Sequence, residues 1–229
     1  MTATAEIISI GDELLYGQTL DTNAHWISHK LDEYNIKVFQ RTTIGDDADQ
    51  ILNAFATAAE RVDIVLITGG LGPTKDDLTK PLLAKYFGVG MVHHEEVLRD
   101  ITLLFAKASR EVTALNAQQA ELPANCEKIT NPVGTAPGMW FYENNTVFVA
   151  MPGVPYEMKS IMTQGILPKL HKMFSKGVLH HHIIKTIGIT ESSLSDLIED
   201  WELNLPQHIK LAYLPTKGQV KLRLTGFGD

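Results

Sequence analysis

The segment DIVLITGGLGPTKDD, residues 63–77, joins an apolar run to a glycine-rich turn and then to a pair of acids. The run from Ile64 to Thr68 carries no charge, as expected of a strand covered on both faces of a parallel sheet. Ligands of such sheets bind beyond the carboxyl ends of the strands, where this turn lies. The segment therefore predicts both a fold class and the place of a site.

The same alternation of strand and helix extends on both sides of this segment. Strands are predicted at residues 5–10 and 36–45, and helices at 21–35 and 46–62, from their apolar periodicity and from capping residues at the helix starts. Alternating strands and helices are typical of a parallel sheet covered by helices. Further along the chain, a hairpin is predicted at 138–151, with its turn at Asn144-Asn145.

Further helices are predicted at 76–88, 94–111, 114–122 and 155–174. From about residue 177 the pattern changes to strand, helix, strand, strand, which indicates a small α+β unit. We therefore expect two domains, at 1–172 and 177–229. The second ends directly after a strand, so we expect it to be incomplete.

Composition excludes several classes of protein. The 229 residues carry a formal net charge of −7 and no cluster of Lys and Arg, which argues against nucleic acid as a partner. No stretch reaches the roughly 20 apolar residues of a membrane span. The N-terminus does not resemble a secretory signal, and Cys126 is the single cysteine, so we expect a cytoplasmic protein.

Acidic residues follow the carboxyl ends of the predicted strands and are expected to converge on one rim. Asp76 and Asp77 follow a loop whose glycines serve no packing purpose, which favours a ligand-binding role. For Asp46 and Asp47 the favoured interpretation is helix capping, because acids oppose the macrodipole in the first turn of a helix. Glu13 lies between these two interpretations.

The glycine loop does not match the common phosphate motifs. Gly69, Gly70 and Gly72 lack the spacing of GxGxxG, and Thr74 precedes Lys75, so the P-loop pattern fails as well. What remains is a cradle of backbone amides for a phosphate, with a divalent cation to reconcile the phosphate with the neighbouring carboxylates. Three lysines near the rim could either contact phosphate or lie in solvent: Lys75, Lys80 and Lys159.

Five segments together resemble the N-terminal domain of the CinA competence/damage-inducible family, within the wider molybdopterin-binding fold. They are IISIGDELLYGQTLDTN, TTIGDD, ITGGLGPTKDDLT, NPVGTAPGM and MPGVPYEM. The stretches IKTIGITESSLSDLI and HIKLAYLPTKGQVKLRLTG resemble the small second domain of the same family. The resemblance implies a three-layer α/β/α domain with a mostly parallel, molybdopterin-binding-like sheet.

The resemblance also implies an activity, the metal-dependent hydrolysis of ADP-ribose to AMP and ribose 5-phosphate, with Mg, Mn or Co as the divalent metal. On this basis Glu13, Asp76 and Asp77 would bind the metal or activate water. Gly69, Gly70, Gly72 and Thr74 would hold the phosphates. The nucleotide or ribose pocket would be lined by Asn23, Asn131, Gly134, Thr135 and Gly138, with Glu157 presented at the rim.

Other functions remain open. The same carboxylates could serve a module that binds molybdopterin or a nucleotide without turnover, or an adenylyl transferase of the molybdenum-cofactor type. Many family members continue into a nicotinamide mononucleotide deamidase domain, and we expect no deamidase activity from these residues. A homodimer is the expected way to cover the apolar faces of the last strands, at Leu222, Leu224 and Phe227.

Overall fold

The structure is a computed structural model that describes residues 2–174 and 178–228. It divides into two compact units, Ala3–Met173 and a smaller unit that begins at Phe174. None of the helices among the described residues has the length and apolar character needed to cross a membrane.

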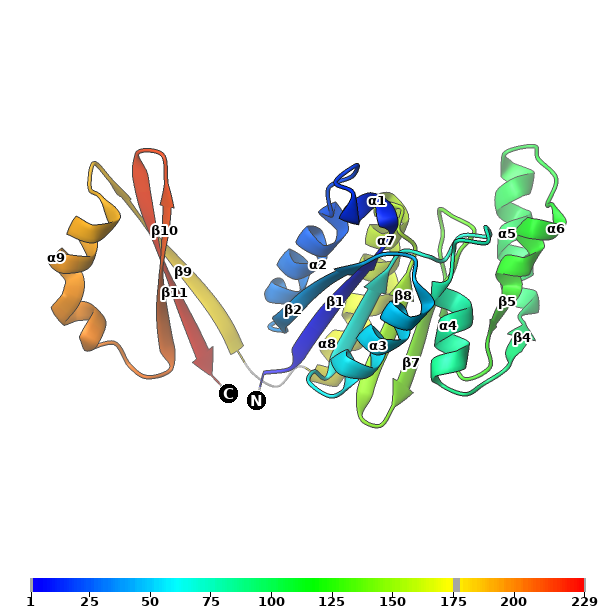
Figure 1. Ribbon diagram of the computed structural model, residues 1–229, viewed down its shortest axis with the longest axis horizontal. Coiled ribbons are helices and arrows are strands. Elements are labelled where there is room, and N and C mark those ends of the chain that lie inside the picture. Colours follow the sequence, from blue (N-terminus) through cyan, green and yellow to red (C-terminus); the bar gives the residue numbers. More distant parts are fainter. Residues whose placement is uncertain (1, 175–177, 229) are drawn as a thin grey trace. The chain divides into compact units, whose positions relative to one another are not determined.

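The larger unit is built on a six-stranded sheet in the order β2-β1-β3-β8-β7-β6 (Figure 1). The first four of these strands are mutually parallel, β7 runs antiparallel to β8, and β6 pairs antiparallel with β7 and so runs in the direction of the first four. The mostly parallel sheet is thereby confirmed. Its strands are β1 (Thr4–Ile10), β2 (Lys37–Ile44), β3 (Ile64–Thr68), β6 (Glu127–Ile129), β7 (Gly138–Glu143) and β8 (Thr146–Met151).

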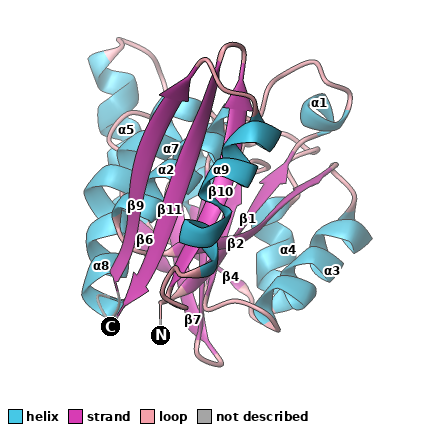
Figure 2. Ribbon diagram, turned by 90° about the vertical axis from the view of Figure 1, so that its left-hand side faces the viewer, coloured by secondary structure: helices cyan, strands magenta, loops and turns pink. Residues whose placement is uncertain are grey.

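Helices cover both faces of this sheet, which confirms the three-layer arrangement (Figures 1 and 2). On one face, Phe55 and Leu83 pack with Ile8, Val65 and Ile67 of the central strands in one buried core. That face carries α3 (Ala48–Ala59) and α4 (Thr79–Tyr86), and the other carries α2 (Thr22–Glu33), α7 (Pro155–Ile161) and α8 (Leu167–Phe174). A π-helical segment, Met162–Ile166, joins α7 to α8.

Local structure between α4 and β6 differs from the prediction. The expected helix at 114–122 ends early: α6 (Ala114–Ala117) and a 3₁₀ turn (Gln118–Ala120) lead into strand β5 (Glu121–Pro123). That strand pairs with β4 (Met91–His93), and Leu122 is fully buried in the main core. Tertiary pairing therefore overrides the local helical pattern. The larger unit also contains helices α1 (Asp12–Leu15) and α5 (Glu95–Lys107).

The predicted turn between β7 and β8 is confirmed. Asn144 and Asn145 both have positive φ, 51° and 64°, the conformation that a tight two-residue hairpin requires.

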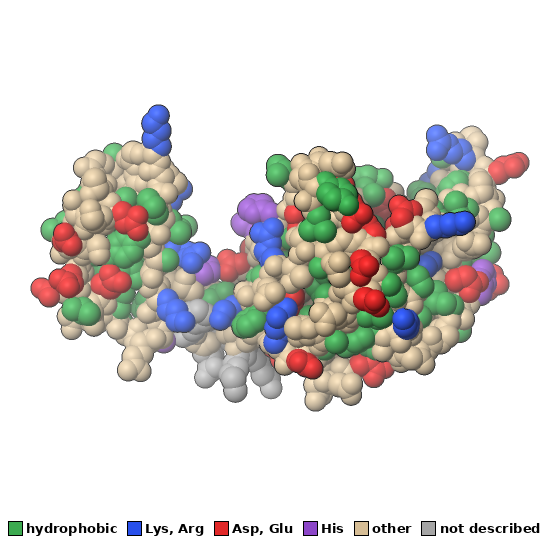
Figure 3. Space-filling model, in the orientation of Figure 1, with side chains coloured by type: hydrophobic (Ala, Val, Ile, Leu, Met, Phe, Trp, Pro, Cys, Tyr) green, Lys and Arg blue, Asp and Glu red, His purple; other side chains and the backbone are tan. Residues whose placement is uncertain are grey.

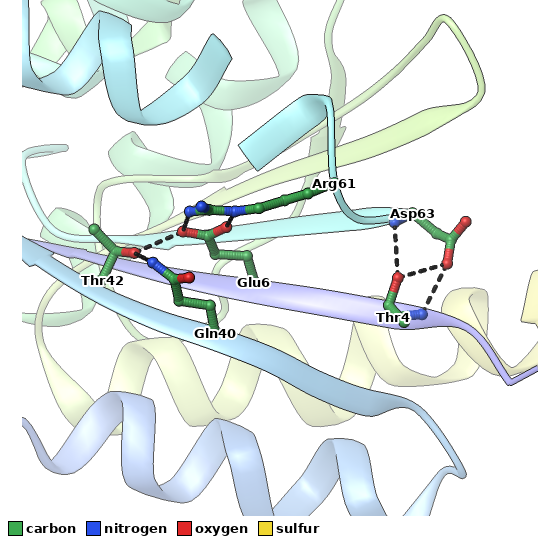
Figure 4. A network of polar contacts seen from close by, with 6 residues as sticks. All are labelled: Thr4, Glu6, Gln40, Thr42, Arg61 and Asp63. Atoms are coloured by element: carbon green, nitrogen blue, oxygen red, sulfur yellow. Dashed lines mark hydrogen bonds and ion pairs between the residues drawn. The ribbon is translucent and has the colours of Figure 1, made fainter. Parts of the chain in front are cut away.

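A buried ion pair ties β1 to its neighbours (Figure 4). Glu6 on β1 is fully buried, and Arg61 donates from Nε to Oε2 and from Nη2 to Oε1, both at 2.7 Å. Thr42 of β2 donates to the same Oε1 at 2.6 Å. The hydrogen bonds from Arg61 to Glu6 raise the pKa of Arg61. Three donors thus satisfy a carboxylate that would otherwise be costly to bury.

The smaller unit has a three-stranded antiparallel sheet in the order β10-β11-β9, with one helix across a face (Figure 2). Its elements follow the predicted order: β9 (Val178–Ile187), α9 (Glu191–Leu203), β10 (Ile209–Thr216) and β11 (Gln219–Gly228). Leu194 of α9 packs against Val220 and Leu222.

This packing corrects part of the argument for a homodimer. Leu222 is only 4% exposed because α9 covers it within the unit, and Leu224 lies on the same face of β11. The side chain of Phe227 lies outside the described part of the chain. A homodimer stays a prediction, and the buried side chain of Leu222 gives no support for it.

Breaking the ion pair should destabilise the larger unit. Arg61→Ala leaves the Glu6 carboxylate buried with Thr42 as its remaining donor, so we expect the free energy of unfolding to fall by about 3 kcal/mol. This is the low end of the usual range, since the Arg61 side chain is 30% exposed. Urea denaturation measures it. The double variant Glu6→Leu/Arg61→Met, which removes both charges, should stay within about 1 kcal/mol of wild type; an equal loss in both variants would contradict the explanation.

Candidate functional site

A cavity of about 440 Å³ lies beyond the carboxyl ends of the parallel strands, the place that the order of strands and helices predicts. Loops after four strands line it. Gly11 and Glu13 follow β1, Asp46 follows β2, and segments within residues 69–77 and 152–157 follow β3 and β8. The cavity thus collects residues that lie far apart in the sequence.

The glycine loop after β3 has a backbone that only glycine adopts easily. Gly69 and Gly70 have φ of 109° and 65°, and a Cβ on Gly69 would lie 2.1 Å from the carbonyl oxygen of Ile10. Both glycine carbonyls accept hydrogen bonds from the buried Thr79, one from its hydroxyl at 2.9 Å and one from its N–H at 3.1 Å. The start of α4 therefore fixes the shape of the loop.

Asp77 closes the same loop. Its Oδ1 accepts from the N–H of Gly72 at 2.8 Å, and its Oδ2 accepts from the N–H of Thr74 at 3.1 Å and from the Thr74 hydroxyl. The carboxylate of Asp77 is therefore held by the hydrogen-bond donors of the glycine loop. With Asp77 engaged in the loop, α4 begins at Thr79 and not at residue 76 as predicted.

The sequence interpretation of Asp46 as a helix cap needs correction. Asp47 does cap α3, with its Oδ1 accepting from Asp49 N at 3.1 Å and from Gln50 N at 2.9 Å. Asp46 instead lines the cavity and accepts from the N–H of Asp12 at 3.2 Å. Burial raises the pKa of Asp46, and the carboxylates of Asp12, Glu13 and Asp76 add to the increase.

The carboxylates at the cavity are ligands that a hard cation such as Mg²⁺ prefers, but they do not form a complete metal-binding site on their own. Among the described residues, no group of three or more His, Cys, Asp or Glu is arranged to hold a metal ion, so the predicted trio of Glu13, Asp76 and Asp77 is not preassembled. Mg²⁺ is typically held by one or two carboxylates together with substrate phosphates. Glu13, Asp46 and Asp76, which line the cavity, fit a metal that binds together with a diphosphate.

Thr135 and Glu157 also line the cavity. Asn131 was predicted to line the pocket, but it is not among the residues that line this cavity. It instead holds Glu157: its Nδ2 donates to Glu157 Oε2 at 2.7 Å and to the carbonyl of Ala136 at 2.8 Å. Gly134 lies against the same carboxylate, since a Cβ there would be 1.9 Å from Glu157 Oε2. These residues position Glu157.

Three other predicted residues lie elsewhere. Gly138 is buried at the start of β7, paired with Ile129, and is not among the residues that line the cavity, so its assignment to the pocket gains no support here. Thr74 holds Asp77 and does not line the cavity. Asn23 lines a smaller, adjoining cavity.

Comparison with known proteins identifies the family of the chain. Residues 6–172 match the family model "Probable molybdopterin binding domain", and residues 181–229 match "Damage-inducible protein CinA KH domain". A CinA-like protein of Cytophaga hutchinsonii is 49% identical over 98% of this chain and 54% of its own length. The chain belongs to the CinA family. It spans about half the length of the curated relatives it matches.

Solved structures support the same assignment. The CinA structure from Thermoplasma acidophilum is 34% identical, with a TM-score of 0.66 over 76% of this chain and 98% of that one. A molybdopterin biosynthesis protein from Mycobacterium abscessus, 18% identical, has a TM-score of 0.52 over 77% of this chain and 96% of that one. The second likeness shows the fold alone.

Gln119 is a cavity residue of this CinA chain that sequence reasoning missed. Its side chain is 1% exposed, and its Nε2 donates to the carbonyl of Leu71 in the glycine loop at 3.0 Å. Its Oε1 accepts from Lys80 Nζ at 3.4 Å. A glutamine among alanines forms no motif, so nothing local to it in the sequence points to this contact.

The predicted lysines have other partners or lie in solvent. Lys80 donates to the carbonyl of Gln118 at 3.2 Å, and burial lowers its pKa against the opposing effect of Glu121 and Asp77. Lys159 Nζ lies 5.9 Å from the centre of the Trp26 ring, and Lys75 is exposed. None of the three lysines lines the cavity.

The acidic wall should reduce stability in a pH-dependent way. A raised folded-state pKa of Asp46 means that folding disfavours its charged form, a penalty that grows as pH rises above the unfolded value near 3.8. Asp46→Asn should therefore stabilise the protein by up to about 1 kcal/mol at pH 7 and not at pH 3. Urea denaturation at both pH values tests this.

Asp49→Asn serves as the control, because it removes one acid that is exposed on α3 outside the cavity. It should give no stabilisation at pH 7. An equal gain from Asp46→Asn at both pH values would contradict an electrostatic cause.

Proposed function

We propose that this chain hydrolyses the diphosphate of ADP-ribose to AMP and ribose 5-phosphate with the help of a divalent metal, Mg, Mn or Co. The observation that carries the proposal is the cavity itself, in which a glycine loop closed by Asp77 faces a wall of carboxylates. Its volume of about 440 Å³ is in the range of small-molecule sites. The resemblance to the CinA family supplies the substrate.

In this proposal the glycine loop contacts the phosphates, and Glu13 and Asp76 hold the metal with the diphosphate. The bound metal would neutralise phosphate charge and polarise the phosphorus–oxygen bonds. Water attacks one phosphorus, the bond to the bridging oxygen breaks, and a carboxylate accepts the proton of the water. Asp46 suits the role of base, because it lines the cavity and its raised pKa makes it a stronger proton acceptor than an ordinary aspartate.

Asp76 has the opposite property. The neighbouring Thr74 hydroxyl and then its own backbone N–H lower its pKa, so its carboxylate is ionised at neutral pH and suits a cation. The proposed compartment is the cytoplasm, on the basis of the single cysteine and a nucleotide substrate.

A second candidate function is binding of molybdopterin, or adenylyl transfer to it, without hydrolysis of ADP-ribose. The description of the family model that matches residues 6–172 favours it. The two candidates share the cavity, since molybdopterin also carries a phosphate. They differ in whether the carboxylates activate water.

Release of AMP from ADP-ribose by the purified chain separates the two candidates. We expect turnover that stops with a chelator and returns with Mg²⁺, Mn²⁺ or Co²⁺. Asp77→Ala should reduce it by about 100-fold or more, the effect typical of losing preorganised donors at a reacting phosphate or oxyanion. Asp49→Ala, which removes an acid outside the cavity, should retain it.

The contrary outcome is also specific. No AMP with any of the three metals, together with saturable binding of molybdopterin, would overturn the hydrolase proposal and favour the second candidate.

A further inference from the structure

The charges of the smaller unit are separated between its helix and its strands. Residues 178–228 contain five Asp or Glu and five Lys or Arg. All five acids lie on α9: Glu191, Asp196, Glu199, Asp200 and Glu202. All five bases lie on the strands or on the turn between β10 and β11: Lys185, Lys210, Lys217, Lys221 and Arg223. In Figure 3 the acidic side chains of this unit accordingly lie over α9 and the basic ones over the strands.

Strand pairing places four of these bases on the side of the sheet that α9 does not cover, which we call the open face. Leu222 of β11 packs with α9, so its neighbours Lys221 and Arg223 point to the opposite side. Directly opposite residues of antiparallel strands share a face, and Lys185 of β9 is opposite Lys221. Lys210 belongs to the same face by the register of β10 with β11. Pairing thus gathers bases that form no cluster in the sequence.

The described part of the smaller unit does not balance the charge of the open face. Lys185 and Lys221 are directly opposite each other, and like charges in that position destabilise a sheet. Neither of them, nor Arg223, forms an ion pair with any described residue. The Arg223 Nε is buried and has no hydrogen-bond partner among those residues. The open face therefore favours an anionic partner.

Exposed aliphatic side chains flank a base on the same face. Ile183 and Ile187 are 50% and 82% exposed, and each lies two positions from Lys185 on β9. Lysines beside aliphatic groups suit a membrane surface, because their stems lie along the apolar boundary while the ammonium groups reach the headgroups. A cluster of roughly four to eight Lys and Arg is typical of surfaces that recognise anionic lipids.

Two other kinds of anionic partner fit the open face less well. Single-stranded nucleic acid is usually held by aromatic rings that stack on the bases, whereas the residues that flank Lys185 are isoleucines. Protein interfaces are usually depleted in lysine, whereas three of the four bases here are lysines. Both comparisons favour a lipid surface.

We propose that the open face of the smaller unit binds an anionic phospholipid surface, with the bases at the phosphate groups and Ile183 and Ile187 at the start of the acyl region. The formal net charge of −7 does not oppose this, because residues 178–228 carry equal numbers of acids and bases. Charges of the larger unit that lie more than about 10 Å from the lipid are largely screened at 0.1 M salt. No residue of the cavity takes part, so the proposal is independent of the proposed hydrolysis.

Cosedimentation of the full chain with lipid vesicles tests the proposal. We expect binding to vesicles made of equal parts of phosphatidylglycerol and phosphatidylcholine, and none to vesicles of phosphatidylcholine alone. Binding should be lost as NaCl rises from about 0.05 M to about 0.5 M, because salt screens the charges. Equal binding to the two kinds of vesicle, or binding to neither, would overturn the proposal.

The double variant Lys185→Gln/Lys221→Gln tests whether the open face is responsible. Each lysine removed should weaken binding to the mixed vesicles about fivefold, the usual scale for one basic residue near an anionic surface, so the pair should cost roughly 25-fold. The variant should fold, since it removes a repulsion between strands, and urea denaturation verifies this. Lys107→Gln/Lys172→Gln removes the same charge from exposed positions of the larger unit and should bind as wild type does. An equal loss in both variants would contradict a role of the open face.

A single-stranded oligonucleotide distinguishes the competing polyanion. Binding of the oligonucleotide without binding of the mixed vesicles would show that the partner is nucleic acid and that the lipid proposal is wrong. Ile187→Ser should weaken vesicle binding about tenfold, the scale of withdrawing one isoleucine side chain from an apolar environment. Unchanged vesicle binding in this variant would contradict the contact with the acyl region.

Discussion

The carboxylate of Asp77 is the interaction on which the site depends. A loop of three glycines has many accessible conformations, and this side chain selects one by accepting from the backbone of Gly72 and Thr74. Thr79 fixes the other end of the loop through the carbonyls of Gly69 and Gly70. The negative charge of Asp77 is thus compensated by N–H groups of the glycine loop itself, which leaves the other acids to face the cavity.

Charge is distributed unevenly in the larger unit. At the carboxyl ends of the strands, burial and then the neighbouring carboxylates raise the pKa of Asp46, an arrangement that opposes folding. Within β1, Glu6 is instead fully paired with Arg61 and Thr42, so the sheet buries a charge with its partners. Stability therefore comes from the apolar layers and the paired charge, and the unpaired charge is concentrated where a ligand would bind.

Much of this could be predicted from the sequence. Apolar runs such as Ile64–Thr68 give the parallel strands, the Asn144-Asn145 pair gives the hairpin, and acids that follow strand ends must meet at one edge of a parallel sheet. What the sequence does not reveal depends on contacts between distant segments. Gln119 contacts the glycine loop from the segment that connects α4 to β6. Gly138 is buried because β7 pairs with β6.

Asp46 and Asp47 show the limit most directly. The two residues are adjacent and identical, and the local pattern gives both the role of a cap. Only the packing of α1 beside β2 decides that one caps α3 and the other faces the cavity. The orientation of the Asn23 amide likewise depends on Gly153, 130 positions away.

The hydrogen bonds within the glycine loop also have a kinetic meaning. Because Asp77 and Thr79 hold the loop through the chain's own atoms, its shape does not wait for a ligand to impose it. A phosphate that enters meets a receptor whose conformational entropy has already been given up during folding, so little of the binding free energy is spent on ordering the loop. Binding then needs no slow rearrangement of the glycine loop after the ligand first meets the protein.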